Sequence, residues 1–121
     1  MDLAAVYEHL TAKPGATETF PFGPQALVLK VKGKMFALLA PEAIPPSVSL
    51  KCDPEEAVRL RERYDAVQPG YHLNKKHWNT VLLDGRVPPE EVRALLDASY
   101  ALVVAGLKKA DRDALRDAAG H

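Results

Sequence analysis

The chain has 121 residues, of which 47% are hydrophobic and 26% are charged, and this composition is typical of one globular domain spanning residues 1–121. Sixteen basic and sixteen acidic side chains cancel, so no overall field favours DNA, RNA or a membrane surface. The single cysteine cannot close an intramolecular disulfide, the amino-terminal residues do not resemble a signal peptide, and no run approaches the ~20 apolar residues of a membrane span. We therefore expect a cytoplasmic protein without membrane contact.

The first elements in the chain are predicted to be a helix and a broken segment. Apolar residues at positions 3, 6, 7 and 10 follow helical spacing and indicate a short amphipathic helix that ends near Pro14. Residues 20–24 read Phe-Pro-Phe-Gly-Pro, which is too rigid and too interrupted for a regular element.

Three strands are expected next. Residues 26–32 and 34–39 are predicted to form a β-hairpin that turns at Gly33, because glycine supplies the backbone freedom of a tight turn. The outer face of the first strand is predicted to carry Val28, Lys30 and Lys32. Residues 47–52 alternate clearly, with Val48, Leu50 and Cys52 facing inward and Ser47, Ser49 and Lys51 facing outward.

The second half of the chain is dominated by helices. Asp53 is predicted to cap a helix that starts with Pro54 and runs to about Tyr64. A turn at 68–71 leads to a strand at 78–83. A longer helix follows from Pro88, with an inner face of Val92, Leu95, Leu96, Ser99, Leu102 and Val103, and a last surface helix covers 110–118. This order predicts an α+β fold, with a mostly antiparallel sheet and helices packed on one face.

No residue pattern points to catalysis or to metal binding. The histidines at 9, 72, 77 and 121 and the lone Cys52 lack the spacing of a metal site, which needs three or four convergent ligands. Cys52 is expected to act as a small hydrophobe, and the Ser99 hydroxyl to be satisfied inside the core. We therefore predict a protein that is not an enzyme and that holds no cofactor and no metal.

The remaining candidate for function is a basic and aromatic surface. Residues 66–83 contain two lysines and no acid, and residues 20–52 contain four lysines and one glutamate. Ammonium groups seek phosphates, and aromatic rings stack on bases. The candidate residues are Lys75, Lys76, His77 and Trp78 with Tyr71 and Asn74, together with Lys30, Lys32 and Lys51 on the outer side of the sheet. Exposed lysines are equally common on ordinary solvated strands, and Trp78 is also suited to anchor a core.

The sequence resembles the MmcQ/YjbR family of small bacterial proteins. The segment 69–78, which reads PGYHLNKKHW, is the most specific match, and the resemblance extends in the expected order from Phe20 to Tyr100. The other matching segments are 19–23, 32–38, 49–54, 83–85 and 99–100.

This resemblance implies a CyaY-like, or frataxin-like, fold and DNA binding through a motif described as a double wing. It implies Lys75, Lys76, His77 and Trp78 as the contact surface, and no catalytic residues. With a neutral chain, we expect DNA binding to be weak and largely independent of sequence. Two alternatives stay open: a non-enzymatic protein-interaction or regulatory module, and frataxin-like metal handling. The second fits less well because the first helix has only Asp2 and Glu8 as acids.

Overall fold

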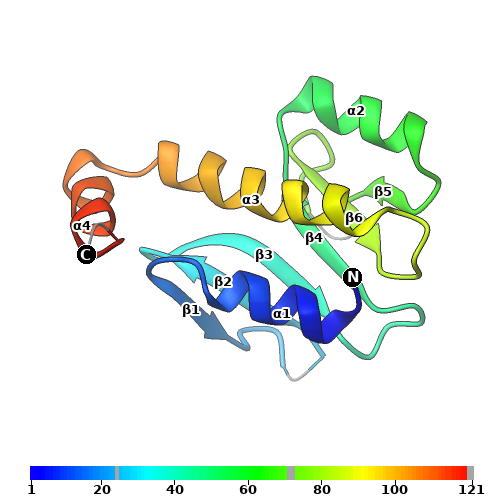
Figure 1. The fold of residues 1–121 in the computed structure, drawn as a ribbon, viewed down its shortest axis with the longest axis horizontal. Helices are drawn as coiled ribbons and strands as arrows, with labels where there is room; N and C mark the ends of the chain where they lie inside the picture. The colour runs from blue at the N-terminus through cyan, green and yellow to red at the C-terminus, as the bar shows by residue number, and fades with distance from the viewer. Residues whose placement is uncertain (24, 71–72, 120–121) are drawn as a thin grey trace.

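The computed structural model describes residues 1–23, 25–70 and 73–119, which form one antiparallel sheet with helices against it (Figure 1). The elements in chain order are α1 (Leu3–Thr11), β1 (Ala16–Thr19), β2 (Leu27–Val31), β3 (Lys34–Ala40), β4 (Ser47–Lys51), α2 (Pro54–Arg63), β5 (Val67–Pro69), β6 (Trp78–Leu82), α3 (Pro89–Ala105) and α4 (Lys109–Ala119). The six strands lie in the order β1-β2-β3-β4-β6-β5. The predicted α+β class is confirmed.

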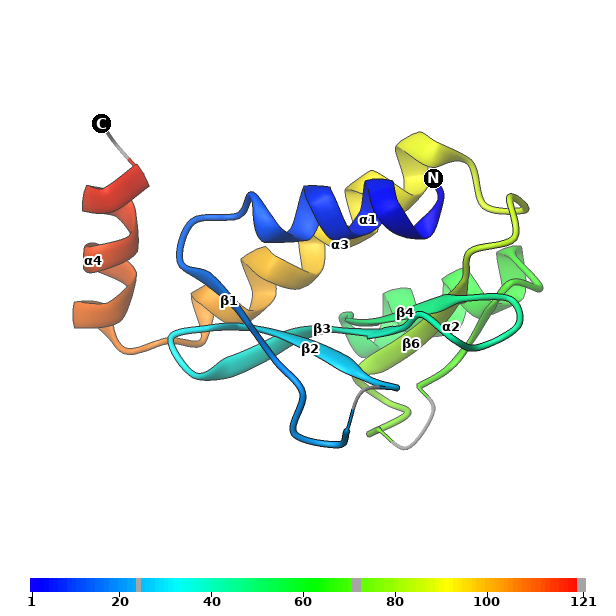
Figure 2. The same cartoon turned by 90° about the horizontal axis from the view of Figure 1, so that it is seen from below.

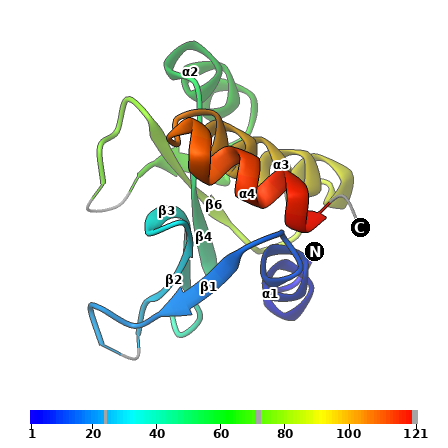
Figure 3. The ribbon, with the colours of Figure 1, turned by 90° about the vertical axis from the view of Figure 1, so that its left-hand side faces the viewer.

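The helices α1, α2 and α3 lie on one face of the sheet, and α4 lies beyond the end of α3 (Figure 1). Figures 2 and 3 show α1 and α3 on the same side, while the connections β1–β2 and β5–β6 project on the other side. The helix α2 packs on β5 and β6, and α3 packs on β3 and β4. The face without helices is called the helix-free face below.

The hydrophobic core lies between the helices and the sheet. Strand register aligns five buried side chains across five strands: Leu27, Leu39, Val48, Val81 and Val67. The α3 face that meets them buries Val92, Leu96, Ser99 and Val103. Ser99 is satisfied as predicted, because its hydroxyl donates to the Phe36 carbonyl at 2.6 Å and accepts from the Lys51 N–H at 2.8 Å.

The β2–β3 hairpin is confirmed. Val31 pairs with Lys34, which leaves Lys32 and Gly33 as a two-residue turn with φ of 49° and 78°. Positive φ at both central positions is the conformation whose twist matches that of the flanking strands. This finding corrects the placement of Lys32, which we predicted on the strand face and which lies in the turn.

Two short strands were not predicted from the sequence. Residues 16–19 pair with β2 as β1, although their side chains are mostly polar. The segment predicted as a turn at 68–71 begins with the last two residues of β5, and its residue Pro69 is tolerated there because β5 is an edge strand that pairs only with β6. Both strands owe their conformation to pairing with a neighbour rather than to their own composition.

Three further details differ from expectation. Val28 was predicted to face solvent, yet it is buried on the helix-free face, where it pairs with Leu38 and Thr19. Asp53 precedes α2 but makes no side-chain capping hydrogen bond. Leu102 was predicted on the inner face of α3 and remains 39% exposed, because it borders a groove between α2 and α3.

Within the residues that the structure describes, no helix is both long enough and apolar enough to traverse a bilayer.

Candidate nucleic-acid interface

Three of the candidate residues lie in one row across the helix-free face. Lys51 of β4 is directly opposite Trp78 of β6, and side chains directly opposite in antiparallel strands point to the same face. Lys30 of β2 is one residue beyond Leu29, as Lys51 is one residue beyond Leu50, and Leu29 and Leu50 both pair with Ala37. A β-bulge follows Leu29, so that Lys30 pairs with Met35 and lies slightly farther along the sheet. The register therefore places Lys30, Lys51 and Trp78 near the same end of the sheet.

Trp78 joins this row to the basic segment before β6. Its side chain is partly buried, and it begins β6, so the predicted strand is confirmed. The Trp78 carbonyl accepts a hydrogen bond from the Gly70 N–H at 2.9 Å, which closes the base of the connection between β5 and β6. The ring is thus held at the junction of the sheet and the loop.

The segment 73–77 is a compact turn that exposes its basic side chains. The Asn74 side chain accepts from the Lys76 N–H at 2.9 Å, and its carbonyl accepts from the His77 N–H at 3.3 Å. The Lys75 ammonium group donates to the Gly70 carbonyl at 3.1 Å, and Arg61 of α2 donates to the Lys75 carbonyl at 3.2 Å. All three basic side chains of the turn are exposed, but the Lys75 ammonium group is engaged with the loop backbone. The candidate Tyr71 lies outside the described residues, as does the neighbouring His72.

The candidate lysines differ from other basic residues of the described chain in their lack of ion pairs. Among the described residues, no ion pair involves the lysines at 30, 32, 51, 75 or 76, whereas basic residues elsewhere do pair, at positions 9, 13, 59, 86 and 116. A cation that is not neutralised within the protein is available to a phosphate. Lys32 is exposed in the hairpin turn, beyond the row formed by Lys30, Lys51 and Trp78.

A second loop on the same side carries exposed aromatic rings that the sequence analysis did not select. Phe20 and Phe22 are 55% and 69% exposed. Figures 2 and 3 show that the connection between β1 and β2 projects from the helix-free side, as the connection between β5 and β6 does. The sequence contains a signal for this exposure, namely two phenylalanines alternating with prolines at 20–24. Such a rigid segment cannot fold around both rings to bury them, so their exposure could have been predicted.

Between the two loops, short polar side chains line the helix-free face. Ser49 and Thr80 are paired in register, and their hydroxyls are 2.8 Å apart. Both are nearly inaccessible, although the alternation places them on the helix-free side. Leu38 lies beside Ser49, and Trp78 is two residues from Thr80, so longer neighbours shield these hydroxyls from water.

The structure shows the surroundings of Cys52 and His9, two residues that the sequence analysis considered for catalysis or metal binding. Burial, followed by the charges of Glu56 and Asp53, raises the pKa of the Cys52 thiol, so at neutral pH it is not an activated nucleophile. His9 bonds Asp97 at 2.7 Å and so helps to connect α1 to α3. In the described part of the chain, no three His, Cys, Asp or Glu side chains gather in a way that could hold a metal ion.

The close approach of Gly70 to Trp78 gives a test of how the loop is held. A Cβ at position 70 would lie 2.8 Å from the Trp78 Cβ and 3.0 Å from its carbonyl oxygen. Gly70→Ala is expected to lower the free energy of unfolding by roughly 1–2 kcal/mol, since backbone must move to relieve the overlap. Urea denaturation followed by Trp78 fluorescence measures this change.

Gly106→Ala is the matched control. Its nearest atom would be the Val103 carbonyl oxygen at 3.6 Å, and its φ of −87° suits any residue. We expect its stability to change by less than about 0.5 kcal/mol or to rise. Equal losses in the two variants would contradict the contact between Gly70 and Trp78.

Comparison with known proteins supports the resemblance noted in the sequence. The YjbR family model matches residues 11–102. The Escherichia coli (strain K12) protein YjbR is 39% identical over 104 residues, which are 86% of this chain and 88% of that protein. The protein YbdF of Escherichia coli O157:H7 is 38% identical over 114 residues, covering 89% of this chain and 93% of the relative.

Solved structures agree with this family and with the fold. The crystal structure of Deinococcus radiodurans protein DR2400 superposes with a TM-score of 0.88 and 43% identity, covering 94% of this chain and 87% of the other. A Pseudomonas syringae crystal structure gives a TM-score of 0.74 at 28% identity, covering 84% of this chain and 98% of the other. The names of these proteins state no activity. The sequence match and the shared architecture together show that the chain belongs to the YjbR family.

Proposed function

We propose that this protein binds DNA without catalysing a reaction, weakly and with little sequence preference, through its helix-free face. The observation that carries the proposal is the common location of a partly exposed tryptophan and of lysines that make no ion pair with any residue described in the structure. Lys30, Lys51 and Trp78 share one row, and Lys76 and His77 continue it on the adjoining loop.

The chemistry of this face suits a phosphate backbone together with unpaired bases. Lysines contribute to affinity through phosphate contacts that carry no sequence information. Phe20, Phe22 and Trp78 add rings that stack on any base. Because stacking needs bases that are not paired, we expect single-stranded DNA to bind more tightly than duplex DNA of the same length.

A second candidate function is a protein-interaction module. It is favoured by the exposure of large apolar side chains in loops, namely Phe20, Phe22 and Ile44, of which Ile44 is 99% exposed. Exposed apolar side chains are common in protein interfaces. This candidate predicts binding that does not depend strongly on salt, so the experiment below distinguishes the two functions.

The test is a binding titration against single-stranded and duplex DNA over a range of salt concentrations. Trp78 is the only tryptophan, so its fluorescence reports directly from the proposed contact surface. A face with about three to five phosphate contacts is expected to lose roughly two orders of magnitude in affinity between 50 and 200 mM salt. Replacing two contacting lysines is expected to reduce the slope of log affinity against log salt by about two units.

Lys51→Gln/Lys76→Gln is the variant of choice, since Lys75 is committed to the Gly70 carbonyl. Lys108→Gln/Lys109→Gln is the matched control, because it also removes two positive charges from exposed positions. These lysines lie at the start of α4, which follows the far end of α3 (Figure 1). We expect the first double variant to bind more weakly to every sequence and the control to bind like the parent protein. No binding by the parent at 50 mM salt, or equal binding by both variants, would overturn the proposal.

A further inference from the structure

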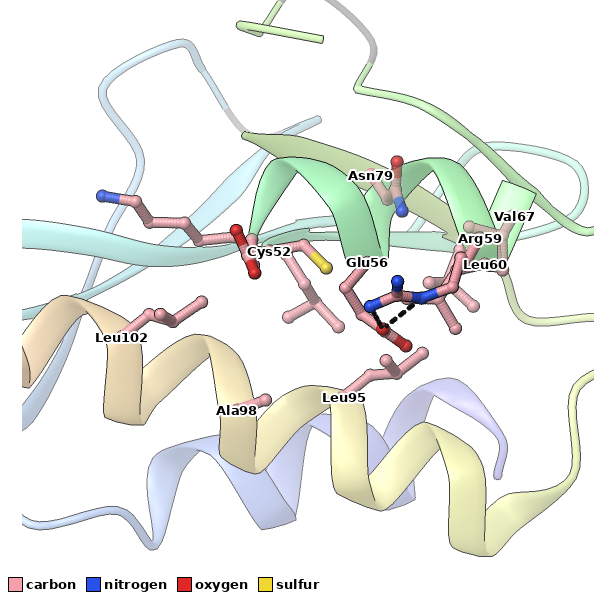
Figure 4. Close-up of a pocket in the computed structure, with 13 residues that line it drawn as sticks. Cys52, Glu56, Arg59, Leu60, Val67, Asn79, Leu95, Ala98 and Leu102 are labelled. Atoms are coloured by element: carbon pink, nitrogen blue, oxygen red, sulfur yellow. Dashed lines mark hydrogen bonds and ion pairs between the residues drawn. The ribbon is translucent and has the colours of Figure 1, made fainter. Parts of the chain in front are cut away.

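A groove separates α2 from α3 on the opposite side of the sheet from the proposed DNA contacts. The helix α2 covers β5 and β6, and α3 covers β3 and β4, so the surface between the two helices is left open. A cavity of about 320 Å³ occupies this place. The sheet forms its floor, and the two helices form its sides, with α2 above and α3 below in Figure 4.

The cavity is lined chiefly by apolar side chains. The sheet contributes Leu50, Val67 and Val81, and α2 contributes Leu60. Figure 4 shows Leu95, Ala98 and Leu102 pointing from α3 toward α2. The 39% exposure of Leu102 follows from this position, since the side chain borders an unfilled space.

The charges of the cavity lining sum to zero. Glu56 and Arg59 form an ion pair at 2.6 Å, and the other two charged residues of the lining, Lys51 and Asp53, carry opposite charges without forming an ion pair with each other. The Asn79 amide donates to the Ala57 carbonyl and accepts from Arg61. A charged ligand would therefore lose hydration without meeting a net opposite charge in the lining.

We propose that the α2–α3 groove binds a small uncharged molecule with a flat apolar body of about two fused rings. The volume agrees with this size, since a cavity of about 150 Å³ lined by aliphatic side chains accommodates benzene, and 320 Å³ is about twice as large. The volume also falls in the range of known ligand pockets, from about 300 to 1,000 Å³. The lining gives the ligand class: apolar walls favour an apolar body, and balanced charges favour a neutral one.

Cys52 provides a natural probe of occupancy. It is the only cysteine in the chain, and Figure 4 shows its sulfur directed into the space between α2 and α3. A molecule that fills the groove must cover this sulfur. The rate at which N-ethylmaleimide alkylates Cys52, followed by mass spectrometry, therefore measures whether the groove is filled.

The experiment uses 2-naphthol as an uncharged two-ring probe. At saturation it is expected to slow the alkylation of Cys52 at least fivefold, with a Kd on the order of 0.1–1 mM for a ligand of this size. Naphthalene-2-sulfonate and 2-naphthylmethylammonium have the same ring system with a negative and a positive charge. Each is expected to bind at least tenfold more weakly than 2-naphthol.

Two alanines on α3 provide a matched pair of variants. Ala98 lines the groove and Ala94, one turn earlier, does not, although both are exposed. Ala98→Trp is expected to fill the groove, to slow the alkylation of Cys52 without any probe, and to abolish protection by 2-naphthol. Ala94→Trp is expected to behave like the parent protein. Melting temperatures of the two variants show that both remain folded.

The proposal is overturned if saturating 2-naphthol leaves the alkylation rate of the parent unchanged. It is also overturned if folded Ala98→Trp is protected as well as the parent, or if the sulfonate or the ammonium analogue protects as strongly as 2-naphthol. None of these results depends on whether the helix-free face binds DNA, since the alkylation of Cys52 is measured with the protein and the small probes alone.

Discussion

Phe36→Ala is expected to lower the free energy of unfolding by about 3–5 kcal/mol, the largest loss we expect from a single substitution in this protein. Phe36 is fully buried where β3 bulges against β2, and its ring meets Tyr100 edge to face with 5.2 Å between centroids. Alanine at position 36 would leave a cavity between β3 and α3. Because domains are stable by only about 5–15 kcal/mol, this change removes a large part of the total.

Urea denaturation measures the loss, which should appear as a midpoint lower by roughly 2 M with little change in slope. Phe22→Ala is the matched control, because it removes the same ring from a position that is 69% exposed. We expect this control to change stability by less than about 0.5 kcal/mol. Losses of similar size in both variants would show that Phe36 does not have the core position described here.

Asn79→Ala is expected to lower the free energy of unfolding by about 2–3 kcal/mol. The Asn79 side chain is buried between the sheet and α2, where its NH₂ group donates to the Ala57 carbonyl at 3.2 Å. Its oxygen accepts from Arg61 at 2.7 Å, a charge-assisted bond. The same Arg61 nitrogen donates to the Lys75 carbonyl, so the substitution also loosens the basic loop.

A double-mutant cycle isolates the bond between Asn79 and Arg61. The stability of Asn79→Ala, Arg61→Met and the double variant should reveal a coupling energy of at least about 1 kcal/mol. Gln68→Ala is the control, since it shortens an exposed amide on β5. Additive effects in the cycle would contradict the bond, and unchanged Trp78 emission in Asn79→Ala would contradict its role in holding the loop.

These two substitutions bear on different parts of the proposed DNA contact surface. Phe36 supports β3, which lies between the strands that carry Lys30 and Lys51. Asn79 supports the segment that presents Lys76 and His77. Neither Phe36 nor Asn79 is itself a proposed DNA contact. A folded variant of either residue is therefore expected to weaken DNA binding only if it displaces the contacting lysines or His77.

The helices and the hairpin could be predicted from the sequence because their signals are local. Pro54 with two following glutamates starts α2, Gly106 ends α3, and Gly33 permits the hairpin turn. In each case the residue types determine the backbone conformation within a few positions. Family membership could also be predicted, since the segment 69–78 is distinctive in itself.

The short strands could not be predicted, because their stability comes from distant partners. The residues of β1 pair with β2, and those of β5 pair with β6 across an intervening loop. A run of three or four residues is too short to show an alternation of apolar and polar side chains, especially when most of them are polar or one is proline. The burial of Val28 and Ser49 on the helix-free face depends in the same way on which side chains lie next to them across the sheet.

By itself, the sequence determined the α+β class, the family, the positions of most helices and the residues from which a basic surface could be built. Only the tertiary structure decided how those residues are used. Register placed Lys30, Lys51 and Trp78 in one row, the loop bonds diverted Lys75 to the Gly70 carbonyl, and the separation of α2 from α3 opened the groove beside Cys52. The physical reason is that side-chain periodicity is local, whereas strand pairing and helix placement bring together residues that are far apart in the chain.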